Sequence, residues 1–320
     1  MAGHWLAELD GSHLTVAVPA SSANLGAGYD CLGLALAMTN RVELEVRVWS
    51  RGEIELTVEG EGRNELSEDR DNRFVAGLET TLRAARGELP TGLGWRIAMH
   101  NDIPLARGLG SSAAATVGGV LAGNALAGEK LSTAELLAIA TEIEGHPDNA
   151  AAALLGGFTV AARDTTGVEA LRFDAPRDLR AVLFVPEIRL PTDKMRAALP
   201  AKVPLADAVA NLGAVAVGVA GLATGRYELL SRLTVDRLHE PYRAKVFPGL
   251  PRLVEAAREA GAIGACLSGA GSTTIAFVDS MAGLTRVEAA FIAAAADLDL
   301  AGKVTVVEPR NLGGQVIARG

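Results

Sequence analysis

The stretch of the chain that most clearly suggests chemistry runs from residue 104 to 116 and reads P-L-A-R-G-L-G-S-S-A-A-A-T. Gly108 and Gly110 permit backbone angles closed to other residues and let a ligand approach the main chain. Ser111 and Ser112 stand where the N-cap of the following Ala-rich helix is expected. Such a helix start offers unpaired N–H groups and a positive dipole end, which commonly bind phosphate. We therefore expect a phosphate-binding loop here.

An ordinary serine-capped turn uses the same residue types, so the five residues Gly-Leu-Gly-Ser-Ser leave that alternative open. The small residues that follow, among them Ala113 and Ala114, keep one helix face thin and favour a ligand near the first turns. Two common nucleotide motifs are absent from the sequence. The chain has no Gly-Lys-Ser or Gly-Lys-Thr, and Ala113 stands where the dinucleotide motif G-x-G-x-x-G has its third glycine. The second absence disfavours an oxidoreductase.

Composition limits the class of protein. The chain has 320 residues, of which 49% are hydrophobic, so a large core or two domains can form. Its net charge is −8 and its pI about 5.3, without the basic stripe of nucleic-acid binders. Cys31 and Cys266 are too far apart in sequence to suggest a metal site or a disulfide framework, which fits a reducing compartment. No signal-peptide pattern opens the chain, and we expect a cytoplasmic protein.

The longest apolar run, residues 208–224, could suggest a membrane span. It consists mostly of Ala, Gly and Val and contains Asn211. A span needs about 20 strongly apolar residues. The sequence therefore favours a buried helix of a globular domain.

The elements that must position the glycine loop follow from periodicity. Alternating apolar residues predict strands at 14–18, 42–48, 54–58 and 95–99, and the second and third of these read as a hairpin. Ser132 and Glu135 form a capping box before a helix that ends at Gly145, and Pro147 suits a first helical position. Thr192 and Asp193 are expected to cap a short helix. Further strands and helices are expected at 74–85, 113–126, 158–162, 181–185, 205–223, 250–260, 262–267, 274–278, 284–297 and 303–307.

Helices that alternate with antiparallel hairpins indicate an α+β fold, not a doubly wound parallel sheet. Any domain boundary is expected between Phe158 and Ala181.

Three clusters in this order resemble the motifs of the GHMP kinase superfamily, small-molecule kinases that use ATP without a P-loop. They are P-A-S-S-A-N-L-G-A-G-Y-D (19–30), P-L-A-R-G-L-G-S-S-A-A (104–114) and G-A-C-L-S-G-A-G-S-T (264–273). Within the superfamily, three other segments resemble the branch that phosphorylates L-homoserine. They are E-G-H-P-D-N-A (144–150), T-D-K-M-R-A-A-L-P (192–200) and H-E-P-Y-R (239–243). The resemblance extends from about Leu14 to Ala318.

The resemblance implies a two-domain GHMP kinase fold. Residues 1–165 would form an ATP-binding domain, which carries the phosphate loop and resembles domain 2 of ribosomal protein S5. Residues 166–320 would form a ferredoxin-like domain that completes the substrate site. The implied reaction moves the γ-phosphoryl group of ATP to the side-chain hydroxyl of L-homoserine, a step of threonine biosynthesis. We expect no nucleic-acid or membrane partner, and a homodimer is left open.

The resemblance also implies roles for residues around the phosphates. Ser112 and Glu144 match the family's metal-side residues and would hold Mg²⁺, which prefers hard oxygen ligands. A carboxylate near a helix C-terminus is disfavoured by the dipole, so Glu144 should have a cation nearby. Asn72 is expected near adenine. The nucleotide would contact Pro104, Leu105, Ala106, Arg107, Gly108, Leu109, Gly110, Ser111, Ser112, Ala113 and Ala114.

Homoserine is a zwitterion, which calls for a carboxylate facing its ammonium group and guanidinium groups facing its carboxylate. Asp30 matches the first requirement, and Arg196 and Arg243 match the second. The polar contacts expected around the substrate come from Asn24, His146 and Asn149. Thr192 resembles a family threonine near the active site, so the expected catalytic set is Ser112, Glu144, Asp30 and Thr192. We expect catalysis by positioning and Mg²⁺, without a dedicated general base.

Two alternatives remain beside this interpretation. A kinase of the same superfamily for another alcohol, such as mevalonate, would not need two arginines plus an acid. A non-catalytic binding protein on the same fold would not need both Ser112 and Glu144.

Overall fold

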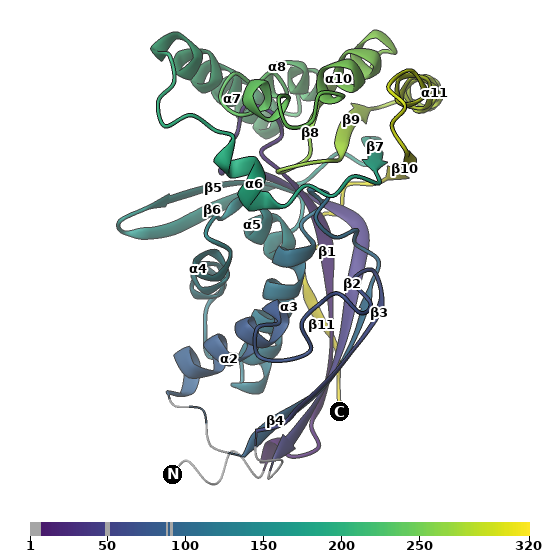
Figure 1. The fold of residues 1–320 in the computed structure, drawn as a ribbon. Helices are drawn as coiled ribbons and strands as arrows, with labels where there is room; N and C mark the ends of the chain where they lie inside the picture. Colours follow the sequence, from purple (N-terminus) through teal and green to yellow (C-terminus); the bar gives the residue numbers. More distant parts are fainter. Residues whose placement is uncertain (1–7, 49–51, 88, 90–91) are drawn as a thin grey trace.

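The larger sheet is built from the alternating apolar segments. In the computed structural model, which describes residues 8–48, 52–87, 89 and 92–320, its main path runs β11-β1-β2-β4-β3, and β5 and β6 extend it from β2 (Figure 1). Its strands are β1 (His13–Ala23), β2 (Leu32–Val48), β3 (Ile54–Gly60), β4 (Leu93–Asn101), β5 (Phe158–Asp164), β6 (Gly167–Phe173) and β11 (Gln315–Arg319).

The predicted hairpin of β2 and β3 is wrong. β2 pairs antiparallel with β4, and β3 pairs parallel with β4 from the far side. The burial of the strands explains this order. Trp95, Ile97 and Met99 of β4 are 1% exposed each, as suits a central strand, whereas β3 is half exposed and lies at the edge. A parallel pair needs a crossover, and α2 (Arg73–Arg86) lies in the connection from β3 to β4.

Helices cover one face of this sheet (Figure 1). They are α2, α3 (Ser111–Leu126), α4 (Thr133–Glu144) and α5 (Asp148–Leu155). The predicted capping box of α4 is present, and the helix ends at Gly145 with φ of 85°. The glycines of α3 allow close packing, because a Cβ on Gly119 would lie 2.0 Å from the Phe74 carbonyl oxygen of α2.

Three predicted helix starts are shifted by one or two residues. Gly110, with φ of 72°, is the N-cap of α3, so Ser111 and Ser112 are its first two helical residues and cap nothing. Pro147 is the N-cap of α5, one position before the predicted one. Pro191 precedes α6 (Thr192–Ala197), and Thr192 makes no capping hydrogen bond. The serine side chains at the start of α3 are thus not used for capping.

The second sheet is antiparallel with strand order β10-β7-β9-β8. Its elements follow in the order β7 (Arg180–Pro186), α10 (Leu250–Glu259), β8 (Gly264–Leu267), β9 (Thr274–Val278), α11 (Met281–Asp297) and β10 (Gly302–Val307). This βαββαβ arrangement confirms the ferredoxin-like prediction. The long connection from β7 to α10 holds α6, α7 (Leu205–Thr224), the 3₁₀ turn η1 (Tyr227–Leu229), α8 (Leu230–Leu233) and α9 (Glu240–Arg243).

Strand β7 joins the two halves of the molecule because both of its faces are buried. Leu183 belongs to the core shared with the first sheet, and its neighbours Val182 and Phe184 belong to the core under α10 and α11. A strand buried on both faces is expected to be a continuous apolar run, as R-A-V-L-F-V-P nearly is.

The sheets divide the chain differently from the limits 1–165 and 166–320. That division falls in the turn between β5 and β6, which pair with each other in the first sheet. The C-terminal strand β11 also returns to the first sheet, where it pairs with β1. The domain limits stay a prediction, and the sheet connectivity gives no support for a cut at residue 165.

Helix α7 is not the buried helix that the sequence favoured. Its Leu205, Val209 and Leu212 are 80%, 58% and 71% exposed. By length and composition alone the helix could cross a membrane. An 18-residue window of it has a mean hydropathy of 1.7, and 22% of that window is buried in the structure. Its other face belongs to the folded domain, because Asn211 donates to the Ala27 carbonyl oxygen at 3.1 Å and Gly218 packs on Leu233.

Candidate active site

The three glycine-rich clusters of the sequence lie against one another. Ser21 N donates to the Leu109 carbonyl oxygen at 3.1 Å, and Thr273 N donates to the Arg107 carbonyl oxygen at 3.1 Å. Gly269 N in turn donates to the Ala23 carbonyl oxygen at 3.0 Å. The phosphate-loop candidate is therefore held between the ends of β1 and β8.

Two glycines of the loop are required by this contact. A Cβ on Gly108 would lie 2.0 Å from the Ser268 carbonyl oxygen, and one on Gly110 would lie 2.1 Å from Ser21 Oγ. Both glycines also have positive φ, 74° and 72°. Their role thus extends beyond ligand access, since they let the first and third clusters close on the loop.

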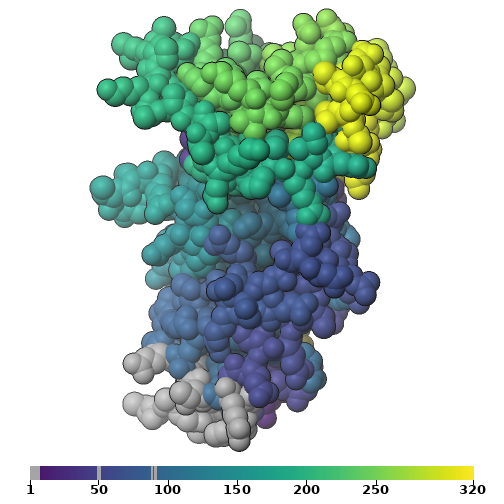
Figure 2. All heavy atoms as spheres, in the orientation of Figure 1, coloured from purple at the N-terminus to yellow at the C-terminus, as the bar shows by residue number. Residues whose placement is uncertain are grey.

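A cavity of about 480 Å³ opens beside the loop and collects the predicted site residues. On the face drawn in Figure 2, the green segment near residue 190 lies directly above blue residues from the first third of the chain. Of the predicted residues, these line the cavity: Asn24, Asp30, Asn72, Pro104, Leu105, Ala106, Gly108, Leu109, Gly110, Ser111, Ser112, Ala113, Glu144, His146, Asn149, Thr192, Arg196 and Arg243.

Two predicted nucleotide contacts do not line it, Arg107 and Ala114. The Arg107 guanidinium donates to the carbonyl oxygens of Pro186 and Glu187, at 2.8 and 3.1 Å, so it ties the loop to the end of β7. Ala114 is 2% exposed and packs in the core under the helix.

Glu144 meets the start of α3 from the last position of α4. Its Oε1 accepts hydrogen bonds from Ser112 Oγ at 3.0 Å and from Thr116 Oγ1 at 2.6 Å. Ser112 and Thr116 are one helical turn apart, so both hydroxyls face the carboxylate. The predicted pair Ser112 and Glu144 is thus adjacent, and Thr116 joins it.

Asp30 and Arg196 form a bidentate ion pair. Arg196 Nη1 and Nη2 lie 2.9 and 2.6 Å from the two oxygens of Asp30, and Nη1 also donates to Tyr29 Oη at 2.8 Å. The side chains of Arg196 and Asp30 are 33% and 31% exposed, so both charges can reach a ligand. The hydrogen bonds that Arg196 donates to Asp30 raise the pKa of Arg196 despite its partial burial.

Arg243 is far more enclosed, at 1% exposure. Its Nη1 donates to His239 Nδ1 at 3.0 Å and to the Gly269 carbonyl oxygen at 3.1 Å. Its guanidinium carbon lies 5.3 Å from the centre of the Tyr29 ring. Its Nε is buried and has no hydrogen-bond partner among the described residues.

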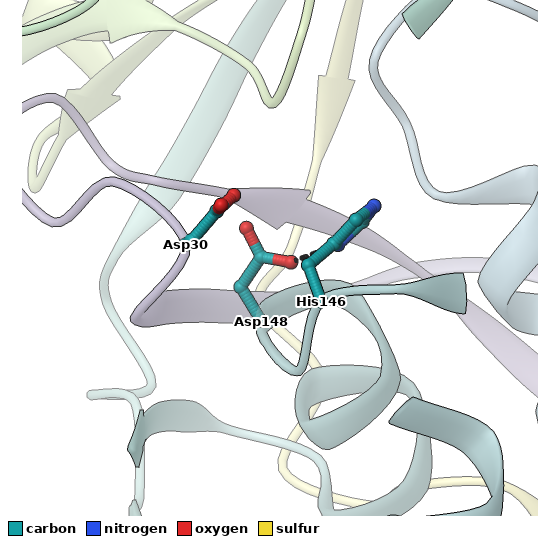
Figure 3. A group of neighbouring side chains, drawn as sticks. All are labelled: Asp30, His146 and Asp148. Atoms are coloured by element: carbon teal, nitrogen blue, oxygen red, sulfur yellow. Dashed lines mark hydrogen bonds and ion pairs between the residues drawn. The ribbon is translucent and has the colours of Figure 1, made fainter. Parts of the chain in front are cut away.

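His146 is paired with an acid that the sequence analysis gave no role. Its Nδ1 lies 2.6 Å from Oδ1 of Asp148, and Figure 3 shows the Asp148 carboxylate between His146 and Asp30. Burial alone would lower the pKa of His146. The hydrogen bond and charge of Asp148 outweigh it and raise that pKa above its ordinary value. The three residues could also hold a cation, since their ligand atoms lie within 4.8 Å of one another.

Two predicted substrate contacts already serve the framework. Asn24 Oδ1 accepts from Asp30 N at 3.0 Å, and its Nδ2 donates to the Gly269 carbonyl oxygen at 2.8 Å. The side-chain oxygen of Asn149 accepts from Ser21 Oγ at 2.8 Å. These amides therefore fix the loop that carries Asp30 and join α5 to β1.

Asn72 and Thr192 lie at the cavity wall. Asn72 is the N-cap of α2, with Oδ1 accepting from Phe74 N at 2.9 Å, and it is 5% exposed. Its position is set by helix capping, so nearness to adenine remains a prediction. Thr192 is an exposed residue at the start of α6, four residues before Arg196.

Sequence reasoning missed Tyr29 and Asp148. Asp148 is 2% exposed. The ring of Tyr29 lies under the guanidinium groups of Arg196 and Arg243, and its centre is 5.6 Å from the guanidinium carbon of Arg196. The signals were present, since Tyr29 precedes Asp30 and the H-x-D spacing of His146 and Asp148 permits a local pair. Only the contact with distant arginines shows what the tyrosine does.

The cavity thus offers a helix start with free N–H groups, a hydroxyl–carboxylate pair and a group of opposite charges. The first suits phosphate, the second suits a hard cation, and the third suits a small zwitterion.

Comparison with known proteins shows the family of the chain. The family model of the GHMP kinases N terminal domain matches residues 73–157, and that of GHMP kinases C terminal matches residues 211–297. The homoserine kinase of Moorella thermoacetica is 46% identical over 263 residues, which cover 82% of this chain and 86% of that protein.

Solved structures of the same superfamily have a similar fold. The homoserine kinase of Cytophaga hutchinsonii is 30% identical with a TM-score of 0.84 and covers 95% of this chain and 97% of its own. Mevalonate kinase of L. major is 16% identical, with a TM-score of 0.66 over 92% of this chain and 95% of that one, and shows the shared fold alone. The chain therefore belongs to the GHMP kinase superfamily and, within it, to the homoserine kinase family.

Proposed function

We propose that this cavity transfers the γ-phosphoryl group of ATP to the side-chain hydroxyl of L-homoserine and releases O-phospho-L-homoserine, as in threonine biosynthesis. The observation that carries the proposal is the charge arrangement beside the phosphate loop. One carboxylate, Asp30, and two guanidinium groups, Arg196 and Arg243, line the same cavity as the start of α3. A zwitterionic amino acid with a hydroxyl matches this arrangement, and an uncharged sugar or a simple hydroxy acid does not.

The triphosphate binds at the start of α3 in this proposal. Gly110 leaves the first N–H groups of the helix without side-chain caps, so they and the dipole face the anion. Loop residues 104–113 surround the nucleotide, and Asn72 stays the candidate for the adenine end. Because Arg107 and Ala114 do not line the cavity, our proposal gives their side chains no direct nucleotide contact.

Mg²⁺ fits the residues around Glu144. The donor set there consists of hard oxygens, and the carboxylate stands near a helix C-terminus, where the dipole disfavours it without a cation. Ser112 and Glu144 would hold the ion, which when bound neutralises negative charge on the β- and γ-phosphates. Because Ser112 lies at the loop itself, the same residues bring the cation side and the phosphate side together.

Homoserine binds among the charged groups. Asp30 faces its ammonium group, and Arg243 with Arg196 faces its carboxylate. Arg243 is suited to this because it lines the cavity while its Nη1 is held by the protein. His146, Asn149 and Asn24 complete the polar wall.

The chain supplies orientation and charge, and no residue is assigned as a dedicated base. Asp30 is engaged by Arg196, and phosphoryl transfer depends mainly on positioning and charge neutralisation. Thr192 stands at the start of α6, the helix that carries Arg196, and lines the cavity, so we keep it in the proposed catalytic set as a wall residue. The two cysteines are free, which fits the cytoplasmic location that we propose.

A coupled ADP-release assay with a panel of alcohols tests the proposal. L-Homoserine should give Mg²⁺-dependent ADP release, whereas mevalonate, galactose and shikimate should give almost none. Comparable turnover of mevalonate would favour the alternative of a kinase of this superfamily that acts on another alcohol. No release with any alcohol would favour a non-catalytic relative.

A further inference from the structure

His239 does not line the cavity, but it contacts Arg243, which does. It is 0% exposed, and its two ring nitrogens contact different parts of the chain. Nε2 lies 2.7 Å from the Gly26 carbonyl oxygen, and Nδ1 lies 3.0 Å from Arg243 Nη1. Gly26 belongs to the first glycine-rich cluster, 213 residues before His239, and Arg243 is the last residue of α9.

These contacts fix the proton on the ring. A carbonyl oxygen can only accept, so Nε2 carries the hydrogen and donates it to Gly26. The Arg243 guanidinium can only donate, so Nδ1 is unprotonated and accepts. Burial lowers the pKa of His239 to about 4, and this agrees with a neutral ring.

The surroundings hold the ring in this orientation. Its backbone N–H donates to Asp236 Oδ2 at 2.8 Å, and Asp236 also accepts from Asn211 Nδ2 at 2.7 Å. The ring packs against that of Tyr29, with centres 5.3 Å apart. Tyr29 in turn lies under Arg243, so the imidazole and the phenol ring fix the guanidinium from two sides.

We propose that His239 is a positioning residue for the substrate carboxylate. It accepts from Nη1 of Arg243 and so directs the remaining donors of that guanidinium to the ligand. Because Nε2 is anchored on Gly26, His239 also sets Arg243 relative to the loop that carries Asp30. The inference rests on the proposed function, in which Arg243 meets the homoserine carboxylate.

Two substitutions separate the contacts of His239. His239→Asn keeps an acceptor at the position of Nδ1 and loses the bond to Gly26. His239→Gln keeps a donor near the position of Nε2 and loses the acceptor for Arg243. His13→Gln, on the exposed end of β1 with a side chain 61% exposed, is the matched control.

We expect His239→Gln to raise KM for L-homoserine about tenfold, the effect of one charge-assisted hydrogen bond. Its kcat and its KM for ATP should stay within about twofold of wild type. His239→Asn, which keeps the acceptor for Arg243, should have a KM for L-homoserine close to that of wild type. Arg243→Lys alone should cost about ten- to hundredfold in kcat/KM, since lysine lacks the guanidinium fork. Adding His239→Gln to Arg243→Lys should cost little more, because both remove the same interaction.

The analogue 3-aminopropan-1-ol, which lacks the carboxylate, distinguishes positioning from folding. His239→Gln should leave its turnover unchanged relative to wild type. An equal loss for both substrates, or an unchanged KM for L-homoserine, overturns the role of His239. Absence of wild-type turnover of L-homoserine overturns the proposed function instead.

Should the variants fail to fold, nitrogen NMR on the wild-type protein decides the question. One histidine should keep the Nε2–H form between about pH 5 and pH 8, where exposed histidines titrate. L-Homoserine should shift its Nδ1 resonance, and 3-aminopropan-1-ol should not. An equal response to both ligands, or none to either, contradicts the proposal.

Discussion

At the scale of single residues, Glu144 connects two helices at the point where phosphate is expected. Its Oε1 receives hydroxyl donors from Ser112 and Thr116, although it stands at a helix C-terminus. Glu144→Gln keeps the size and removes the charge. We expect kcat to fall about a hundredfold or more, as for removal of one preorganised electrostatic group. KM for L-homoserine should change little, because the substrate charges lie elsewhere.

Glu142→Gln is the control, since Glu142 is exposed on the same helix. It should match wild type in steady-state assays across a Mg²⁺ titration. Near wild-type kcat for Glu144→Gln at saturating Mg²⁺ would remove Glu144 from the cation site.

Glu240 supplies a pH effect on stability. Its carboxylate accepts from Leu267 N at 2.7 Å, and burial raises its pKa to about 8 from 4.5. Between these values the unfolded chain releases a proton that the folded protein keeps, so this group's contribution to stability falls as pH rises. Glu240→Gln removes the titration and retains an acceptor.

We therefore expect Glu240→Gln to gain free energy of unfolding relative to wild type as pH rises from about 5 to 7, by at most about 1.4 kcal/mol per pH unit. Urea unfolding of both proteins at several pH values measures it. A difference that is constant with pH, or that shrinks, would show that Glu240 is ionised in the folded protein.

Most of the residues that line the cavity could be predicted because short motifs carry them. The loop motif also includes Arg107 and Ala114, whose side chains face the end of β7 and the core, so the motif alone does not tell which of its residues face the cavity. Asp148 lay inside a quoted motif, yet its role depends on a hydrogen bond that spacing alone cannot establish. His239 is similar, because its partner Gly26 is remote in sequence.

At the scale of elements, α7 presents an exposed apolar stripe on one face. The stripe consists of Leu205, Val209, Leu212, Ala216, Ala220 and Ala223, all exposed. Asp207, the only charged residue of the helix, is half-buried and paired with Arg237 at 3.5 Å. Within this stripe, large side chains occupy the N-terminal half and small ones the C-terminal half, and Val217, 44% exposed, lies beside the stripe. An antiparallel pair of α7 helices from two copies would therefore set large against small, as a two-fold interface requires.

We predict a homodimer through this stripe. Leu212→Asp should place a charge in the interface and give a monomer by light scattering, with kinase activity per chain as the folding check. Ile292→Asp on α11, where Ile292 is 61% exposed, should leave the dimer intact. A monomeric wild type, or equal behaviour of both variants, would contradict the interface.

Periodicity predicted most elements, and their partners were harder to predict. Ser111 and Ser112 look like caps in sequence, but Gly110 takes the cap position, where φ is 72° and a Cβ would collide with Ser21. The segments of β2 and β3 look like a hairpin because they alternate and are close in sequence. The apolar strand β4 enters between them, since a central position buries Trp95 and Ile97.

At the scale of the whole molecule, the site forms where two sheets meet. The start of α3 and Asp30 come from the first half of the chain, and Arg196 and Arg243 come from the connection between β7 and α10. The two-domain class could be predicted from the motifs. The return of β11 to β1 could not, because strand pairing between the chain ends leaves no local pattern. The cavity exists only when both halves are in place.

In the proposed reaction, this cavity places phosphate on the hydroxyl of an amino acid. Phosphorus NMR of a reaction of the protein with ATP, Mg²⁺ and L-homoserine tests this directly. A phosphomonoester signal coupled to the terminal CH₂ protons of homoserine should grow in step with ADP. ADP formed with inorganic phosphate as the only other product would show an ATPase, and no change in ATP would show a binding protein. Either result would contradict the account.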